Sequence, residues 1–151
     1  MILDGKKVSS EIIEELKPRI DTLIKSGNRP GLSVILVGDN PDSETYVTMK
    51  CKMCHKLQMM SKVYRFKESS QESLQDDIIK TIHHLNEDNT VHGILVQLPL
   101  PKHMNTDLIM NSISHNKDVD GFHIINSGKL FQNRNIQFIP CTPLGCIELL
   151  D

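Results

Sequence analysis

Residues 32–50, LSVILVGDNPDSETYVTMK, decide the fold of this chain. The stretch begins with an apolar run, Leu32 to Val37, between Gly31 and Gly38, and a short run of this kind is typical of a buried strand. Asn40 is suited to cap a following helix, and Pro41 fits its first position, where a missing N–H costs nothing. We therefore expect a buried strand that leads directly into a helix.

Tyr46 and Lys50 stand four residues apart in the expected helix, so both side chains lie on one face of it. A lysine near the end of a buried strand is partly desolvated, and a desolvated amine exchanges protons more readily near neutral pH. Two interpretations stay open, because Tyr-x-x-x-Lys alone is a weak pattern. The pair is either catalytic, or a half-buried packing residue beside a solvated charge.

Length and composition fit one globular domain. The chain has 151 residues, 38% of them hydrophobic, with a net charge of −2. The charge and the lack of a Lys/Arg cluster argue against nucleic-acid binding. No apolar run approaches the roughly 20 residues needed to cross a bilayer, and the first residues do not resemble a secretory leader. We expect a cytoplasmic protein with reduced cysteines, and a mitochondrial location stays open.

The remaining pattern alternates helices with strands. The expected helices cover about 8–24, 41–59, 74–85 and 105–113, with another that begins at Pro143; the expected strands cover 32–37, 62–66, 91–98 and 120–125. The expected caps are Ser9 or Ser10, a Ser69–Glu72 capping box, Asn105 or Thr106, and Thr142. Pro18 should bend or end the first helix.

This alternation predicts an α/β fold with three layers, α/β/α, around a mostly parallel sheet of about four strands. Ligands of such sheets bind beyond the carboxyl ends of the strands. Three segments should meet there: 38–50, 97–101 and 118–121. The site is thus expected to combine residues that are far apart in the sequence.

Two metal patterns carry little weight. Cys51-x-x-Cys54-His55 matches the haem-attachment motif, but it continues a helix and follows no leader, and a zinc site would need histidines that nothing places nearby. The stretch 118–121 is similar to a calcium loop, but Lys129 stands where its last acidic ligand should be. We therefore expect no metal site.

Phosphate and dinucleotide loops are also missing from the sequence. Gly128-Lys129 lacks the upstream glycine of a phosphate loop, and no Gly-x-Gly-x-x-Gly occurs. A nicotinamide cofactor therefore has no evident binding site within these residues. The same absence argues against a short-chain dehydrogenase, which also pairs Tyr and Lys four residues apart.

Gln97 and Asp120 are two further polar candidates. Gln97 closes an apolar strand, so its amide either satisfies the backbone or holds the Lys50 ammonium and tunes its proton affinity. Asp120, beside Gly121, is either a solvated turn residue or an acceptor for the amine or amidine-like edge of a ligand. Neither residue alone separates these alternatives.

Four motifs in order nevertheless resemble one known family. They are 37–50 (VGDNPDSETYVTMK), 93–101 (GILVQLPLP), 117–122 (KDVDGF) and 140–143 (PCTP). Together they resemble the bifunctional methylenetetrahydrofolate dehydrogenase/methenyltetrahydrofolate cyclohydrolase family over essentially the whole chain. The helix after Lys50 departs from the family's acidic stretch and glycine, but this departure touches no proposed site residue.

The resemblance implies roles for individual residues. Lys50 would be the catalytic lysine, Gln97 would hydrogen-bond to it, and Tyr46 would stack on the folate. Asp120 would anchor the polar edge of the pterin. The expected pocket-lining residues are Leu98, Pro99 and Pro101. The implied chemistry is hydride transfer from 5,10-methylenetetrahydrofolate to NADP or NAD, then hydrolysis of the methenyl cation to 10-formyltetrahydrofolate, one-carbon chemistry that serves purine synthesis.

The resemblance also implies a domain organisation. Residues 1–139 would be the folate-binding catalytic domain, and 140–151 would start a linker helix towards a Rossmann NAD(P)-binding domain that the sequence lacks. We therefore expect the catalytic part of a longer, homodimeric enzyme. These residues alone should show no dehydrogenase and at most weak cyclohydrolase activity. The alternative is a folate-binding module without catalysis.

Overall fold

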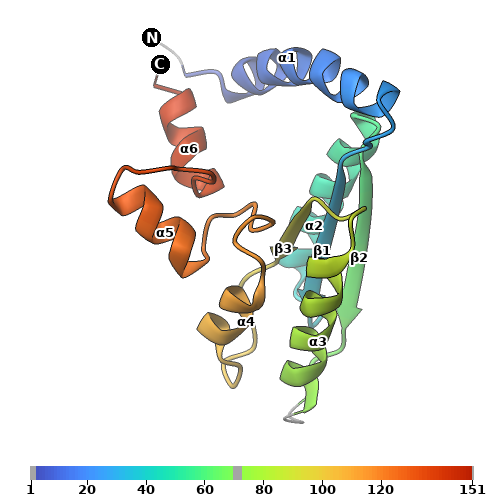
Figure 1. Ribbon diagram of the computed structural model, residues 1–151, viewed down its shortest axis with the longest axis vertical. Helices are drawn as coiled ribbons and strands as arrows, with labels where there is room; N and C mark the ends of the chain where they lie inside the picture. The colour runs from blue at the N-terminus through green and yellow to red at the C-terminus, as the bar shows by residue number, and fades with distance from the viewer. Residues whose placement is uncertain (1–2, 70–72, 151) are drawn as a thin grey trace.

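The computed structural model describes residues 3–69 and 73–150, and Figure 1 shows the path of the chain through them. Helices and strands follow in the order α1 (Gly5–Lys25), β1 (Gly31–Val37), α2 (Pro41–Lys56), β2 (Met60–Phe66), α3 (Ser73–Glu87), β3 (Gly93–Val96), α4 (Thr106–Ser112), α5 (Ile124–Phe131) and α6 (Cys141–Glu148). The predicted α/β class is confirmed.

The sheet of the described residues has three strands in the order β2-β1-β3, and both pairings are parallel. The fourth strand predicted at 120–125 is wrong, since only an isolated bridge joins Ile94 to Asp118 and the chain then turns into α5. The Asp118 carboxylate accepts hydrogen bonds from the N–H groups of Phe122 and His123. Those backbone donors are therefore not available for a strand ladder.

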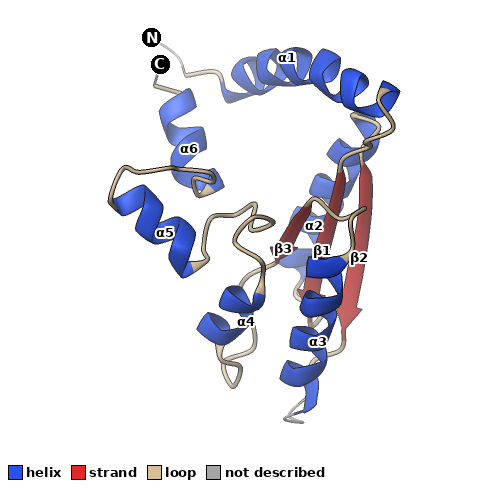
Figure 2. Ribbon diagram, in the orientation of Figure 1, coloured by secondary structure: helices blue, strands red, loops and turns tan. Residues whose placement is uncertain are grey.

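Helices cover both faces of the sheet, as Figure 2 shows. Alternate residues of β1 point to opposite faces, which produces two cores. Ile35 and Val37 pack with the α3 stripe and α4 on one face, whereas Val34 and Leu36 pack with Val47 of α2 on the other. The α3 stripe consists of Leu74, Ile78, Ile82 and Leu85, as predicted. The three predicted layers are therefore present.

The connection from β1 to α2 follows the sequence prediction closely. Gly38 has a φ of +81°, a backbone conformation that glycine adopts without a steric penalty. The Asn40 side chain accepts from the N–H groups of Asp42 and Ser43, and Pro41 occupies the first turn. This unit places the start of α2 beside the carboxyl end of β1.

Other helix starts differ from the predictions. Asp4, rather than Ser9 or Ser10, caps α1, because its carboxylate accepts from the N–H groups of Lys6 and Lys7 one turn earlier. Pro18 lies within this helix and does not end it, since a proline removes one backbone bond while the other turns stay bonded.

The last helix, α6, begins at Cys141 after Pro140 without a side-chain cap, so the expected Thr142 cap is wrong. Asn105 caps α4, as predicted. The Glu72 part of the predicted capping box lies outside the described residues. Within 3–69 and 73–150, no helix is long and apolar enough to cross a membrane.

Candidate functional site

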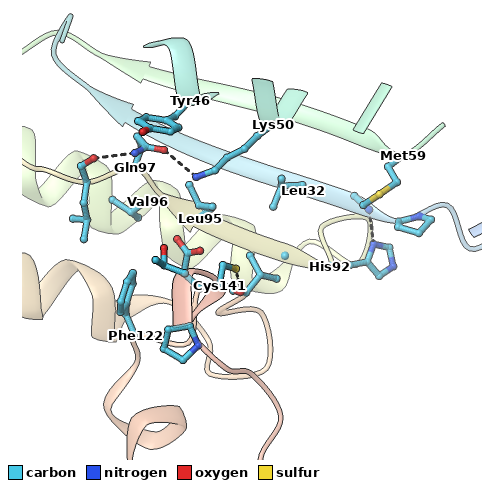
Figure 3. A pocket seen from close by; sticks show the side chains of 18 of the residues that line it. Leu32, Tyr46, Lys50, Met59, His92, Leu95, Val96, Gln97, Phe122 and Cys141 are labelled. Atoms are coloured by element: carbon cyan, nitrogen blue, oxygen red, sulfur yellow. Dashed lines mark hydrogen bonds between the residues drawn. The ribbon is translucent and has the colours of Figure 1, made fainter. Parts of the chain in front are cut away.

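A cavity of about 1050 Å³ runs along β1 and β3 (Figure 3). Its first wall is formed by α2 and the two strands, and its second wall by residues 119–122 and the start of α6. The lining residues are Pro30, Gly31, Leu32, Tyr46, Lys50, Met59, His92, Gly93, Leu95, Val96, Gln97, Leu98, Val119, Asp120, Phe122, Pro140, Cys141, Thr142 and Pro143. The cavity is mostly apolar, with few polar groups inside it, which is typical of a small-molecule site.

Lys50 and Gln97 form the centre of the first wall. The Lys50 Nζ donates to Gln97 Oε1 at 3.0 Å, although the two residues lie 47 positions apart. The Gln97 Nε2 donates to the Leu98 carbonyl at 2.9 Å, so the amide oxygen is held towards the amine (Figure 3). Both side chains are half-buried. The amine is therefore oriented by a neutral acceptor within an apolar cavity.

Tyr46 lies one helical turn before Lys50 and is 58% exposed at the cavity edge. Figure 3 shows its ring close to Gln97, on the same side of the cavity as Lys50. An exposed aromatic face that borders an apolar cavity is suited to stack on a flat ligand ring.

Asp120 lines the cavity from the second wall. Burial raises the pKa of its carboxyl, the Lys50 ammonium counteracts that rise, and the Asp118 carboxylate adds to it. An acid and an amine thus line the same cavity from opposite walls. This arrangement can bind a ligand that carries hydrogen-bond donors on one edge and a reacting carbon near the amine.

Cys141 lies beside Asp120, and its Sγ donates to the Val119 carbonyl at 3.7 Å. Partial burial and the neighbouring Asp120 carboxylate raise the pKa of the Cys141 thiol above its usual 9.0. The thiol therefore stays protonated near neutral pH and acts as a weak donor rather than a nucleophile.

The structure brings together most of the residues predicted for the site. Tyr46, Lys50, Gln97, Leu98 and Asp120 all line the cavity. Pro99 and Pro101 do not line it. The chain turns after Leu98, and both prolines border a separate cavity of about 300 Å³ at the strand ends, together with Asp39 and Glu68. The wall position expected for these two prolines is thus taken by residues from other segments.

Sequence reasoning assigned no site role to the residues that complete the second wall, such as Val119, Phe122 and Cys141. All three lie within motifs that were recognised, 117–122 and 140–143. Their sequence neighbours gave no indication that α6 begins opposite α2, because that arrangement arises from contacts between distant segments.

The Cys51–Cys54–His55 pattern lies on α2, outside the cavity lining. Cys54 is buried, and burial raises the pKa of its thiol. No group of three or more His, Cys, Asp or Glu side chains suited to a metal ion occurs within residues 3–69 and 73–150. The two cysteines therefore pack as small apolar residues in this structure.

Comparison with known proteins identifies a family. Residues 3–120 match the model of the tetrahydrofolate dehydrogenase/cyclohydrolase catalytic domain. The chain is 48% identical over 149 residues to the bifunctional protein FolD of Listeria innocua. The match covers 99% of this chain and 51% of that protein. The chain thus spans about half the length of the curated relatives it matches.

Solved structures agree with this match. The FolD methylenetetrahydrofolate dehydrogenase/cyclohydrolase of Campylobacter jejuni superposes with a TM-score of 0.93 at 49% identity, over 99% of this chain and 52% of that one. The Trypanosoma brucei FolD, solved with NADP cofactor and an inhibitor, has a TM-score of 0.92 at 33% identity, over 99% of this chain and 50% of that one.

Proposed function

Because the chain belongs to the tetrahydrofolate dehydrogenase/cyclohydrolase family, we propose that it forms the folate-binding catalytic domain of a bifunctional enzyme. The whole enzyme would oxidise 5,10-methylenetetrahydrofolate to 5,10-methenyltetrahydrofolate and hydrolyse the product to 10-formyltetrahydrofolate. Residues 1–139 would be the domain itself, and 140–151 would begin the connection to a nucleotide-binding part.

The observation that carries this proposal is the Lys50–Gln97 hydrogen bond of 3.0 Å inside a mostly apolar cavity. In the hydrolysis, water adds to the methenyl carbon, which lies between two nitrogens and carries the positive charge. Lys50 relays one proton away from that water, and the remaining hydroxyl proton moves to one ring nitrogen as the bond between this nitrogen and the carbon breaks. The formyl group then remains on the other nitrogen.

Gln97 has a positioning role in this scheme, since its amide oxygen accepts from the Lys50 amine and fixes where the amine points. A neutral partner suits the reaction, because a carboxylate at the same place would hold the amine protonated. The cavity lining is mostly apolar, so few other polar groups compete for the amine.

The folate would lie between the two walls. We propose that Tyr46 stacks on a flat ring of the substrate, that Asp120 accepts hydrogen bonds from the amidine-like edge of the pterin, and that Leu98 supplies apolar contact. Pro99 and Pro101 border the neighbouring smaller cavity, so we propose no contact with the pterin ring for them.

Among the described residues, the start of α2 does not fit the hydride acceptor, NADP or NAD. Asn40 already accepts from the first free N–H groups of α2, and Asp42 and Glu44 make that helix start negative, which opposes a pyrophosphate. The sequence also contains no Gly-x-Gly-x-x-Gly. We propose that the dinucleotide binds to a part of the enzyme outside these residues.

The test compares hydrolysis of 5,10-methenyltetrahydrofolate by the whole enzyme and by its Lys50→Met variant. We expect a loss of about 100-fold or more, the usual contribution of a positioned proton acceptor. Lys52→Met is the matched control, because Lys52 is exposed on the same helix and does not line the cavity. Equal rates for Lys50→Met and the wild type would remove Lys50 from the mechanism.

Thermal unfolding with and without tetrahydrofolate separates binding from catalysis, since a ligand that binds only the folded state raises the Tm. A raised Tm without turnover would identify a folate-binding module, whereas no shift and no turnover would refute the proposed function of this chain.

We also propose a cytoplasmic location and a homodimer for the whole enzyme. Both come from the family resemblance. Sedimentation equilibrium on the whole enzyme tests the dimer, and a monomeric mass at micromolar concentration would refute it.

A further inference from the structure

Asp118 is fully buried, with an exposed fraction of 0%, and it lies two residues before the site residue Asp120. Its Oδ1 accepts from the Phe122 N–H at 3.3 Å. Its Oδ2 accepts from the His123 N–H at 2.9 Å and from Asn126 Nδ2 at 2.8 Å. A buried carboxylate with three donors is well satisfied, so the chain folds around this side chain.

The backbone on either side of Asp118 is also held. The Ile94 N–H donates to the Lys117 carbonyl at 2.7 Å, which ties the segment to β3, and the Gly121 N–H donates to the Asp118 carbonyl at 3.2 Å. Gly121 has a φ of +70°, which closes the turn. Asp120 is therefore the residue that this turn directs into the cavity, while Asp118 points into the protein.

Asn126 connects the turn to α5. It is 1% exposed, and its Nδ2 donates both to Asp118 and to the His115 carbonyl at 2.8 Å. Both amide hydrogens thus have acceptors, which fixes the orientation of the amide. The carboxylate–amide pair therefore links the segment before the turn, the turn itself and the first turn of α5.

We propose that Asp118 is a positioning residue that acts through Asp120: its carboxylate, braced by Asn126, fixes the turn that presents the Asp120 carboxyl to the pterin. This inference rests on the proposed function, because it deepens the account of the same folate site. Both acceptor oxygens of Asp118 matter as well as its shape. An asparagine at this position would turn an amide N–H₂ towards a backbone donor and leave one of the three donors unpaired.

The test is a double-mutant cycle on tetrahydrofolate binding, measured by calorimetry on the full chain. We expect Asp118→Asn to weaken binding about tenfold, close to 1.4 kcal/mol. If Asp118 acts through Asp120, the same change in an Asp120→Ala background should alter binding less than about twofold. Asp21→Asn, at an exposed position on α1, is the control and should leave binding unchanged. Equal losses in the two backgrounds would overturn the proposal.

A second measurement does not need the ligand. The Asp120 carboxyl is titrated by carbon NMR in the wild type and in Asn126→Ala, which keeps the Asp118 carboxylate and removes only its side-chain brace. If the brace holds the Asp120 carboxyl in its buried place, its removal should relieve the desolvation and move the Asp120 midpoint to lower pH, whereas an unchanged midpoint would overturn the proposal. If the wild type does not bind tetrahydrofolate, the proposed function fails, and the titration then reports only whether the brace fixes the surroundings of the Asp120 carboxyl.

Asn126→Ala replaces Asp118→Asn in the binding measurements if Asp118→Asn does not fold. It keeps the Asp118 charge and its two backbone donors but removes the side-chain brace. We expect about a threefold loss of binding that disappears in the Asp120→Ala background. A threefold loss that persists without Asp120 would indicate a general structural role and overturn the proposal.

Discussion

The two walls of the cavity are built by different forces. The β1–α2 wall rests on a strand with six of its seven residues buried, and Val47 of α2 packs directly against it. The second wall, together with α5 between its two segments, has hardly any apolar core. Asn126 is the one buried residue in α5, none is buried in α6, and Phe131 is 92% exposed.

The second wall is held instead by side-chain hydrogen bonds around Asp118 and by backbone hydrogen bonds to β3. The contrast teaches that the amine proposed as catalytic sits on the wall with the apolar core, whereas the acid proposed to orient the ligand sits on a wall whose geometry depends on a few polar contacts. Changes in the first wall should therefore affect the stability of the whole fold, and changes in the second should affect mainly the site.

The largest expected effect breaks the first wall. Ile35 is 0% exposed at the centre of β1, so Ile35→Ala should lower the free energy of unfolding by about 2–5 kcal/mol. Urea denaturation measures this loss. Ile124→Ala, at a 69% exposed position of the second wall, is the matched control and should change the free energy by less than about 0.5 kcal/mol. Similar losses at both sites would remove the distinction between the walls.

An intermediate effect is expected where the walls touch. A methyl group on Gly93 of β3 would lie 2.6 Å from Val119 Cγ1, so Gly93→Ala should push Val119 away and cost about 1–3 kcal/mol of stability. Because Val119 lines the cavity, the same variant should also bind tetrahydrofolate more weakly.

Gly128→Ala provides the control with the opposite sign. Nothing lies within 4 Å of the added methyl group, and the residue is helical, so stability should rise by roughly 0.5–1 kcal/mol. Thermal unfolding of the two variants checks both signs, and equal shifts would contradict the close contact between the walls.

The smallest expected effect is a pH dependence that belongs to the second wall. Burial raises the pKa of Asp120 above 3.8, its usual value, so the folded state holds this proton more tightly than the unfolded state. This contribution to stability is complete below the unfolded pKa and is lost as the pH rises through the folded pKa. Asp120→Asn should therefore raise the Tm near neutral pH and not at pH 3. A Tm difference between the variant and the wild type that does not vary with pH would contradict the desolvation of the Asp120 carboxyl.

Much of the fold follows from local pattern. The apolar run of β1, the Asn40–Pro41 helix start and the 74–85 stripe each contain enough neighbouring information to define an element. The predicted strand at 120–125 failed because its backbone donors are taken by the side chain of Asp118, a competition that apolar periodicity does not reveal. The cap of α1 was predicted too late in the chain, because the apolar pattern begins only after the first turn of the helix that Asp4 caps.

The sequence by itself determined the buried strand, the helix that follows it, the family, and which amine, ring, amide and acid were candidates. Each of these depends on residues within a few positions of one another or on motifs in a set order. Only the tertiary structure decided that Lys50 meets Gln97 at 3.0 Å, that Asp118 turns inward while Asp120 faces the cavity, and that Pro99 and Pro101 lie outside it. Those outcomes come from parallel strand pairing and buried side-chain hydrogen bonds, which join positions far apart in the chain.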